Sequence, residues 1–92
     1  MAKILLVEDN EKVREMFLAL LEKDGHAVAG VVGEKQAKIV LEKLPPGNCD
    51  LVITDVTNGT AILPFVQGKF PDLPVILVTC DPCLHDHEVG FA

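Results

Sequence analysis

Three short, continuous apolar runs constrain this chain most, because polar residues that can carry chemistry stand at their ends. They are Lys3–Val7 (KILLV), which Glu8 and Asp9 follow directly, residues 50–55 (DLVITD) and residues 75–79 (VILVT). Short apolar runs without alternation are typical of strands that are covered on both faces, as in a parallel sheet. A fourth strand is predicted over residues 26–32 (HAVAGVV), which are small or β-branched.

The segments between the runs show helical spacing. After the capping residue Asn10, apolar residues recur at intervals of three and four, namely Val13, Met16, Phe17, Leu20 and Leu21, and Asp24-Gly25 supplies a left-handed stop. A second helix is marked by Ala37, Val40, Leu41 and Leu44 and ends at Pro45-Pro46-Gly47. Alternating strands and helices predict right-handed crossovers, a parallel sheet and helices on both faces.

A third helix is predicted over residues 61–69, with Pro64 in its first turns. Before it, Val56-Thr57-Asn58-Gly59 has the composition of a tight turn. This helix is short and poorly patterned in the sequence.

Length and charge exclude several classes of protein. Ninety-two residues with 49% apolar and 24% charged content describe one folded domain, residues 1–92. A net charge of −6 argues against a nucleic-acid-binding surface, and the first apolar run is too short for a signal peptide or a membrane span. We therefore expect a cytoplasmic protein. Three cysteines, an odd number, are expected to be free thiols in a reducing compartment.

The polar residues at the strand ends predict a site. In an open α/β sheet, functional groups collect beyond the carboxyl ends of the strands, so Glu8, Asp9, Asp55 and Thr79 are expected at one edge. Three carboxylates repel one another unless a cation lies among them. Hard oxygen ligands with open positions suit Mg²⁺, which also takes phosphate oxygens as ligands.

Three motifs, KILLVEDN, DLVITDV and PDLPVILVT, resemble the first, third and fourth strand signatures of response-regulator receiver domains. The resemblance covers roughly residues 3–80, within the usual uncertainty at element boundaries. It implies a flavodoxin-like, doubly wound α/β fold with strand order 2-1-3-4. The core is expected to contain apolar residues of three strands: Leu5, Val7, Val52, Ile53, Ile76 and Val78.

Carried over to this chain, the resemblance implies that Asp55 accepts a phosphoryl group from a phosphohistidine on a sensor histidine kinase. Glu8 and Asp9 would hold Mg²⁺ together with Asp55, and the backbone carbonyl of Thr57 would be a further metal ligand. Thr79 would bond a phosphate oxygen. Such a stand-alone receiver is a switch that docks to a downstream protein, more than an enzyme.

The chain departs from the family in two respects. Receivers usually continue into a fifth strand, whose Lys pairs with the acceptor carboxylate, and a fifth helix, whereas here no Lys follows Lys69 and the sequence stops at Ala92. The segment from residue 55 to residue 79 is also short and lacks the common Met-Pro pair, so its loop and helix are expected to be contracted. Without the Lys, we expect slow phosphorylation or an incomplete response.

The missing elements also predict self-association. A fourth strand without a neighbour leaves an apolar edge with unpaired backbone groups, which a homodimer through this strand and the C-terminal segment would cover.

Other interpretations stay open. Each acid alone could be a solvated residue at a strand end, Asn10 is a helix cap, and Cys49 is expected to be a small buried hydrophobe. The chain could be a degenerate receiver that acts as a phosphorylation-independent interaction module. It could also be a thiol or metal protein built on a CxxC pair and two histidines, Cys80, Cys83, His85 and His87.

Overall fold

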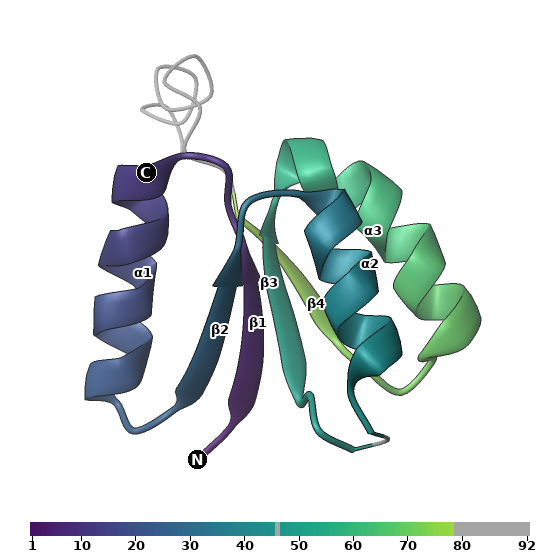
Figure 1. Cartoon of the computed structure of the whole chain (residues 1–92), viewed down its shortest axis with the longest axis horizontal. Coiled ribbons are helices and arrows are strands. Elements are labelled where there is room, and N and C mark those ends of the chain that lie inside the picture. The colour runs from purple at the N-terminus through teal and green to yellow at the C-terminus, as the bar shows by residue number, and fades with distance from the viewer. Residues whose placement is uncertain (46, 79–92) are drawn as a thin grey trace, which may run out of the picture.

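The computed structural model describes residues 1–45 and 47–78, and these form a parallel sheet with helices on both faces (Figure 1). Along the chain the elements are β1 (Lys3–Val7), α1 (Glu11–Lys23), β2 (Ala27–Val31), α2 (Glu34–Lys43), β3 (Leu51–Asp55), α3 (Val56–Lys69) and β4 (Val75–Val78). The strand order is β2-β1-β3-β4, and all pairs are parallel. The predicted flavodoxin-like order is confirmed, and the described strands end within one residue of the predicted runs.

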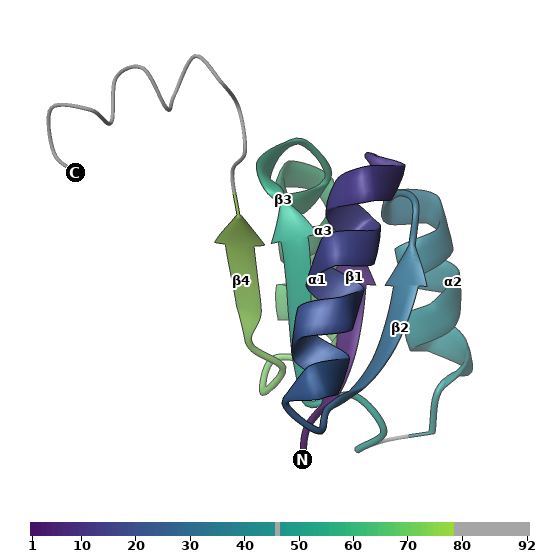
Figure 2. The same ribbon diagram turned by 90° about the vertical axis from the view of Figure 1, so that its left-hand side faces the viewer.

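Each face of the sheet carries its own part of the core. Of the three described helices, α1 lies on one face, and α2 and α3 lie side by side on the other (Figures 1 and 2). Alternate residues of β1 serve the two faces, so Leu5 and Val7 point toward α2 and α3, while Ile4 and Leu6 point toward α1. Burial of successive residues explains why β1 reads as a continuous apolar run.

The predicted core is confirmed for the two central strands. Leu5, Val7, Val52 and Ile53 are buried, and Val78 is partly buried against the cluster beneath α1. The prediction for Ile76 is wrong, because its side chain is 48% exposed. Helix α1 packs against β1 and β2, and no other described helix covers the same face of β4.

The predicted stripe of α1 is only partly correct. Phe17 and Leu21 pack against the core, but Met16 and Leu20 are more than half exposed, because a single helix on a broad sheet face covers residues along one line only. Leu18, which the spacing did not mark, also packs there. A Cβ on Gly30 of β2 would lie 3.2 Å from Leu18 Cδ1, so this glycine lets α1 lie close to the sheet.

The third helix differs most from its prediction. Helix α3 begins at Val56, directly after β3, and spans 14 residues, so the predicted tight turn and the contracted helix are wrong. Gly59 is buried, and a Cβ there would collide with the Leu77 side chain and lie 3.2 Å from Thr54 Cγ2. The first turn of α3 therefore packs on β3 and β4. This tertiary contact outweighs the tendency of Asn58-Gly59 to form a tight turn.

In the described part of the chain, no helix is long and apolar enough to span a bilayer.

Candidate functional site

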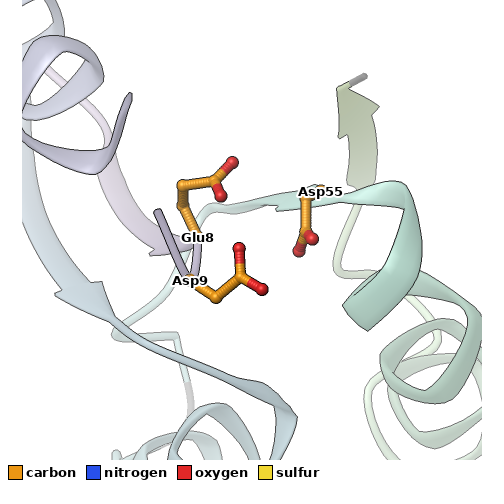
Figure 3. A group of neighbouring side chains, drawn as sticks. All are labelled: Glu8, Asp9 and Asp55. Atoms are coloured by element: carbon orange, nitrogen blue, oxygen red, sulfur yellow. The ribbon is translucent and has the colours of Figure 1, made fainter. Parts of the chain in front are cut away.

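Three acids meet at the carboxyl edge of the sheet, as the sequence predicts. Glu8 and Asp9 directly follow β1, and Asp55 is the last residue of β3, the strand beside β1. Val7 pairs with Thr54 in the register, so the next residues, Glu8 and Asp55, lie level with each other. One carboxylate oxygen from each acid lies within 4.8 Å of the other two (Figure 3).

Glu8 is the most buried of the three acids. Its residue is 9% exposed, and its Oε2 accepts a hydrogen bond from the Asn10 N–H at 3.0 Å. Burial raises the pKa of Glu8 above its usual value; the Asn10 N–H opposes this rise, and the carboxylates of Asp9 and Asp55 add to it. The site is therefore strained electrostatically when all three acids are ionised.

The three acids have no ion-pair partner among residues 1–45 and 47–78. Arg14 Nη1 donates at 2.8 Å to the backbone carbonyl of Glu8 instead of to a carboxylate of the cluster. A cluster of negative charge without a paired side-chain cation is chemically suited to a divalent metal ion.

Asp55 has a hydrogen-bond partner that the sequence interpretation missed. Its Oδ1 accepts from Asn58 Nδ2 at 2.7 Å, and Asn58 Oδ1 in turn accepts from the backbone N–H of Glu34 at 3.3 Å. Asn58 lies in the first turn of α3, and Glu34 is the first residue of α2. An Asn three residues after an acid at a helix start could have signalled the first bond, but nothing local signals the second.

The predicted carbonyl ligand is not aimed at the acids. Thr57 is the second residue of α3, and its carbonyl accepts from Thr60 Oγ1 at 2.9 Å. Carbonyls within an α-helix point toward its carboxyl end, so metal binding by this group would require the first turn of α3 to open. The metal role of the Thr57 carbonyl stays a prediction. The roles predicted for Thr79, Cys80, Cys83, His85 and His87 fall outside the described residues.

Asn10 lies beside the acids, and Cys49 lies at the opposite edge of the sheet. Asn10 caps α1, since its Oδ1 accepts from the Val13 N–H at 3.1 Å. Cys49 is only partly buried and packs beside the core, with its Sγ donating to the Leu51 carbonyl at 3.5 Å. Burial raises the pKa of the Cys49 thiol, which makes it a weak nucleophile at neutral pH.

Comparison with known proteins agrees with this geometry. The family of response regulator receiver domains matches residues 4–88. The response regulator protein FleR of Pseudomonas aeruginosa is 35% identical over 82 residues, which cover 85% of this chain but only 17% of FleR.

Solved structures of receivers share the fold. The non-phosphorylated HemR receiver domain of Leptospira biflexa superposes with a TM-score of 0.74 at 28% identity, over 99% of this chain and 74% of that one. A receiver domain protein of Clostridium thermocellum gives 0.78 at 27%, over 99% and 75%. The MaeR response regulator bound to beryllium trifluoride gives 0.75 at 25%, over 99% and 77%. With its fold, its acidic edge and these relatives, the chain belongs to the response-regulator receiver family of two-component signalling.

Proposed function

We propose that residues 1–92 act as one receiver domain that accepts a phosphoryl group at Asp55, with Mg²⁺ held by Glu8, Asp9 and Asp55. The observation that carries the proposal is the cluster of three carboxylates within 4.8 Å at the carboxyl edge of the sheet. An acceptor at this edge is reachable by another protein, because Asp9 is exposed and Asp55 is partly exposed.

The donor set fits magnesium. All three side chains offer hard carboxylate oxygens, and the family generally binds Mg²⁺. Burial raises the pKa of Glu8, and the neighbouring carboxylates of Asp9 and Asp55 add to the rise, so the ionised form of Glu8 is disfavoured. A divalent cation would offset that cost. When bound, Mg²⁺ would neutralise charge on the phosphoryl oxygens during transfer.

The chain's own residues supply position and reactivity. Asp55 ends a strand that is buried over Val52–Thr54, so its backbone is held in place. It also precedes the first turn of α3, whose N-terminal dipole favours negative charge there. In the proposed reaction a carboxylate oxygen of Asp55 bonds to phosphorus, while the phosphorus–nitrogen bond of the donor phosphohistidine breaks. The electron pair leaves with the imidazole, which then takes a proton from solvent.

Partners follow from the family. Receiver domains interact with sensor histidine kinases and with downstream effectors. For this chain we propose a sensor histidine kinase as phosphodonor and a downstream protein as the reader of the phosphorylated state. The domain is a signalling module, and its chemistry is that of a substrate and switch.

Mg²⁺ calorimetry and phosphodonor labelling test the proposal. The wild type should take up Mg²⁺ and then label with acetyl phosphate, and Asp55→Asn should weaken the first and abolish the second. Asp72→Asn is the matched control, because Asp72 is exposed and distant in the chain from the acids. Labelling of Asp55→Asn at the wild-type level would refute Asp55 as the acceptor.

A degenerate receiver that acts without phosphorylation is the second candidate, and the sequence gives one reason to keep it. No Lys follows Lys69 in these 92 residues, so the cation that receivers aim at the phosphoryl group is missing from them. Loss of a comparable electrostatic donor slows catalysis by roughly 10²–10³-fold. For a protein of these 92 residues we therefore expect slow labelling under the leading proposal, and no Mg²⁺-dependent labelling at all under the second.

A further inference from the structure

We propose that Asn58 is a positioning residue that couples the Asp55 carboxylate to the N-terminus of α2. A group that becomes attached to Asp55 would then change the hydrogen bonding of the first turn of α2 through the Asn58 side chain. That this group is a phosphoryl group rests on the proposed function, whereas the coupling rests on the two hydrogen bonds of Asn58.

The Asn58 amide bridges the Asp55 carboxylate and the Glu34 backbone N–H, and each of these fits only one orientation of the amide. Its Nδ2 donates to Asp55 Oδ1 at 2.7 Å, and its Oδ1 accepts from the Glu34 N–H at 3.3 Å. An ionised carboxylate can only accept and a backbone N–H can only donate, so both ends select the same orientation of the amide. Bonds in such a chain polarise one another, and a change at one end is felt at the other.

Helix α2 depends on this bridge for part of its capping. Its N-cap residue is Gly33, which has no side chain and makes no cap hydrogen bond. The first N–H groups of a helix have no partner within the helix, and a side-chain oxygen normally takes one of them. Here the oxygen comes from Asn58, which is 24 residues away in the sequence and belongs to α3. Asn58 therefore caps α2 from a neighbouring helix.

Asp55 in turn holds Asn58 in the capping position. Among the described residues, Asn58 is the only side chain that donates a hydrogen bond to Asp55. A carboxylate oxygen that becomes bonded to phosphorus loses charge and accepts hydrogen bonds less well, while the phosphoryl oxygens become strong acceptors. The amide would then turn toward the phosphoryl group and withdraw its oxygen from Glu34. Loading of Asp55 should loosen the first turn of α2.

A double-mutant cycle tests the coupling without any phosphoryl chemistry. The measurement is hydrogen exchange of the Glu34 amide by NMR on the full chain. Asp55→Ala removes the acceptor and should speed this exchange about fivefold, a typical effect of losing a helix cap. Asn58→Ala should speed it to a similar extent, and the double variant should be no faster than Asn58→Ala alone. Additive effects of the two substitutions would overturn the proposal.

Asn58→Asp separates the cap from the coupling. The new carboxylate can still accept from Glu34 but cannot donate to Asp55, so Glu34 should stay protected while Asp55→Ala loses its effect. Gln67→Ala, an exposed amide of the same helix, is the control and should change nothing. A response to Asp55→Ala that persists in the Asn58→Asp background would also overturn the coupling.

The coupling can also be tested in the wild-type protein, without any substitution. With Mg²⁺ and beryllofluoride, the Glu34 amide signal should shift as the bound fluoride signal appears in ¹⁹F NMR. Bound fluoride without a change at Glu34 would refute the coupling and leave the proposed function intact. If no fluoride binds, the proposed function fails, and the double-mutant cycle still decides the coupling.

Discussion

At the scale of single residues, Glu8 shows how burial and charge oppose each other at this edge. Its position is dictated by β1, whose last four residues are all buried, so the residue that follows them is also drawn to the margin of the core. Its carboxylate loses water and gains two acidic neighbours. When folding raises the pKa of a carboxyl group, ionisation of that group lowers the free energy of unfolding.

Glu8→Gln should therefore stabilise the metal-free protein at pH 7. Because burial raises the pKa of Glu8 in the folded state, ionisation of the wild type lowers its stability as pH rises through that pKa. The advantage of the variant should shrink as pH falls to 4.5, the ordinary value, and disappear below it, where the carboxyl is largely protonated in both states. Urea unfolding in EDTA at several pH values measures this, and Glu15→Gln, at an exposed glutamate of α1, should show no such trend. A pH-independent difference would contradict the argument.

The helix cap beside the acids gives a second prediction. Asn10 Oδ1 accepts from the Val13 N–H, so Asn10→Ala should lower the free energy of unfolding by about 1 kcal/mol. Asn10→Ser keeps a capping oxygen and should retain most of that stability. Equal losses in the two variants, measured by urea unfolding, would show that the cap contributes little.

The sequence could predict the acids of the site but not their connection to α2. Glu8, Asp9 and Asp55 stand directly after apolar runs, and the parallel sheet brings the ends of those runs together. The bond from Glu34 to Asn58 depends on how α2 and α3 lie against each other, which no local pattern encodes. Thr57 was assigned a carbonyl role from the family pattern, yet here it lies within a helix.

At the scale of elements, the strands were predictable and α3 was not. Continuous apolar runs specify buried strands strongly, because each run has to be covered on two faces. The start of α3 depends instead on whether Gly59 can lie against Leu77 and Thr54, a tertiary fact. Ile62 and Val66 then bury one side of the helix, although its sequence also contains Pro64 and two glycines.

Those two glycines should respond differently to alanine. Gly68 has open space where a Cβ would lie, so Gly68→Ala should raise the free energy of unfolding by about 0.5–1 kcal/mol through helix propensity. Gly59→Ala should raise the free energy of unfolding less, or lower it, because the new Cβ would displace the Leu77 side chain. It would also crowd the buried side chain of Thr54, which is stiff and has little freedom to shift. Urea unfolding of both variants decides this, and a larger gain at position 59 would contradict the packing.

At the scale of the whole molecule, β4 differs from the other described strands because none of its residues is buried. Among the described strands it pairs with β3 alone, and Ile76 and Leu77 are 48% and 45% exposed on opposite faces. Exposed apolar side chains beside backbone groups that pair with no other described strand favour pairing with another chain. A second copy can supply the same surface through a two-fold axis, which makes the contact self-complementary.

We therefore expect a homodimer through β4. Light scattering coupled to size exclusion at micromolar concentration should give twice the chain mass, and Ile76→Ser should shift the protein toward monomer. Ile39→Ser is the matched control, because Ile39 is equally exposed but lies on α2. Each copy carries a net charge of −6, so added salt should strengthen the dimer by screening the repulsion. A monomer mass for the wild type at low and high salt would end this hypothesis, and equal loss of dimer in the two serine variants would place the contact elsewhere.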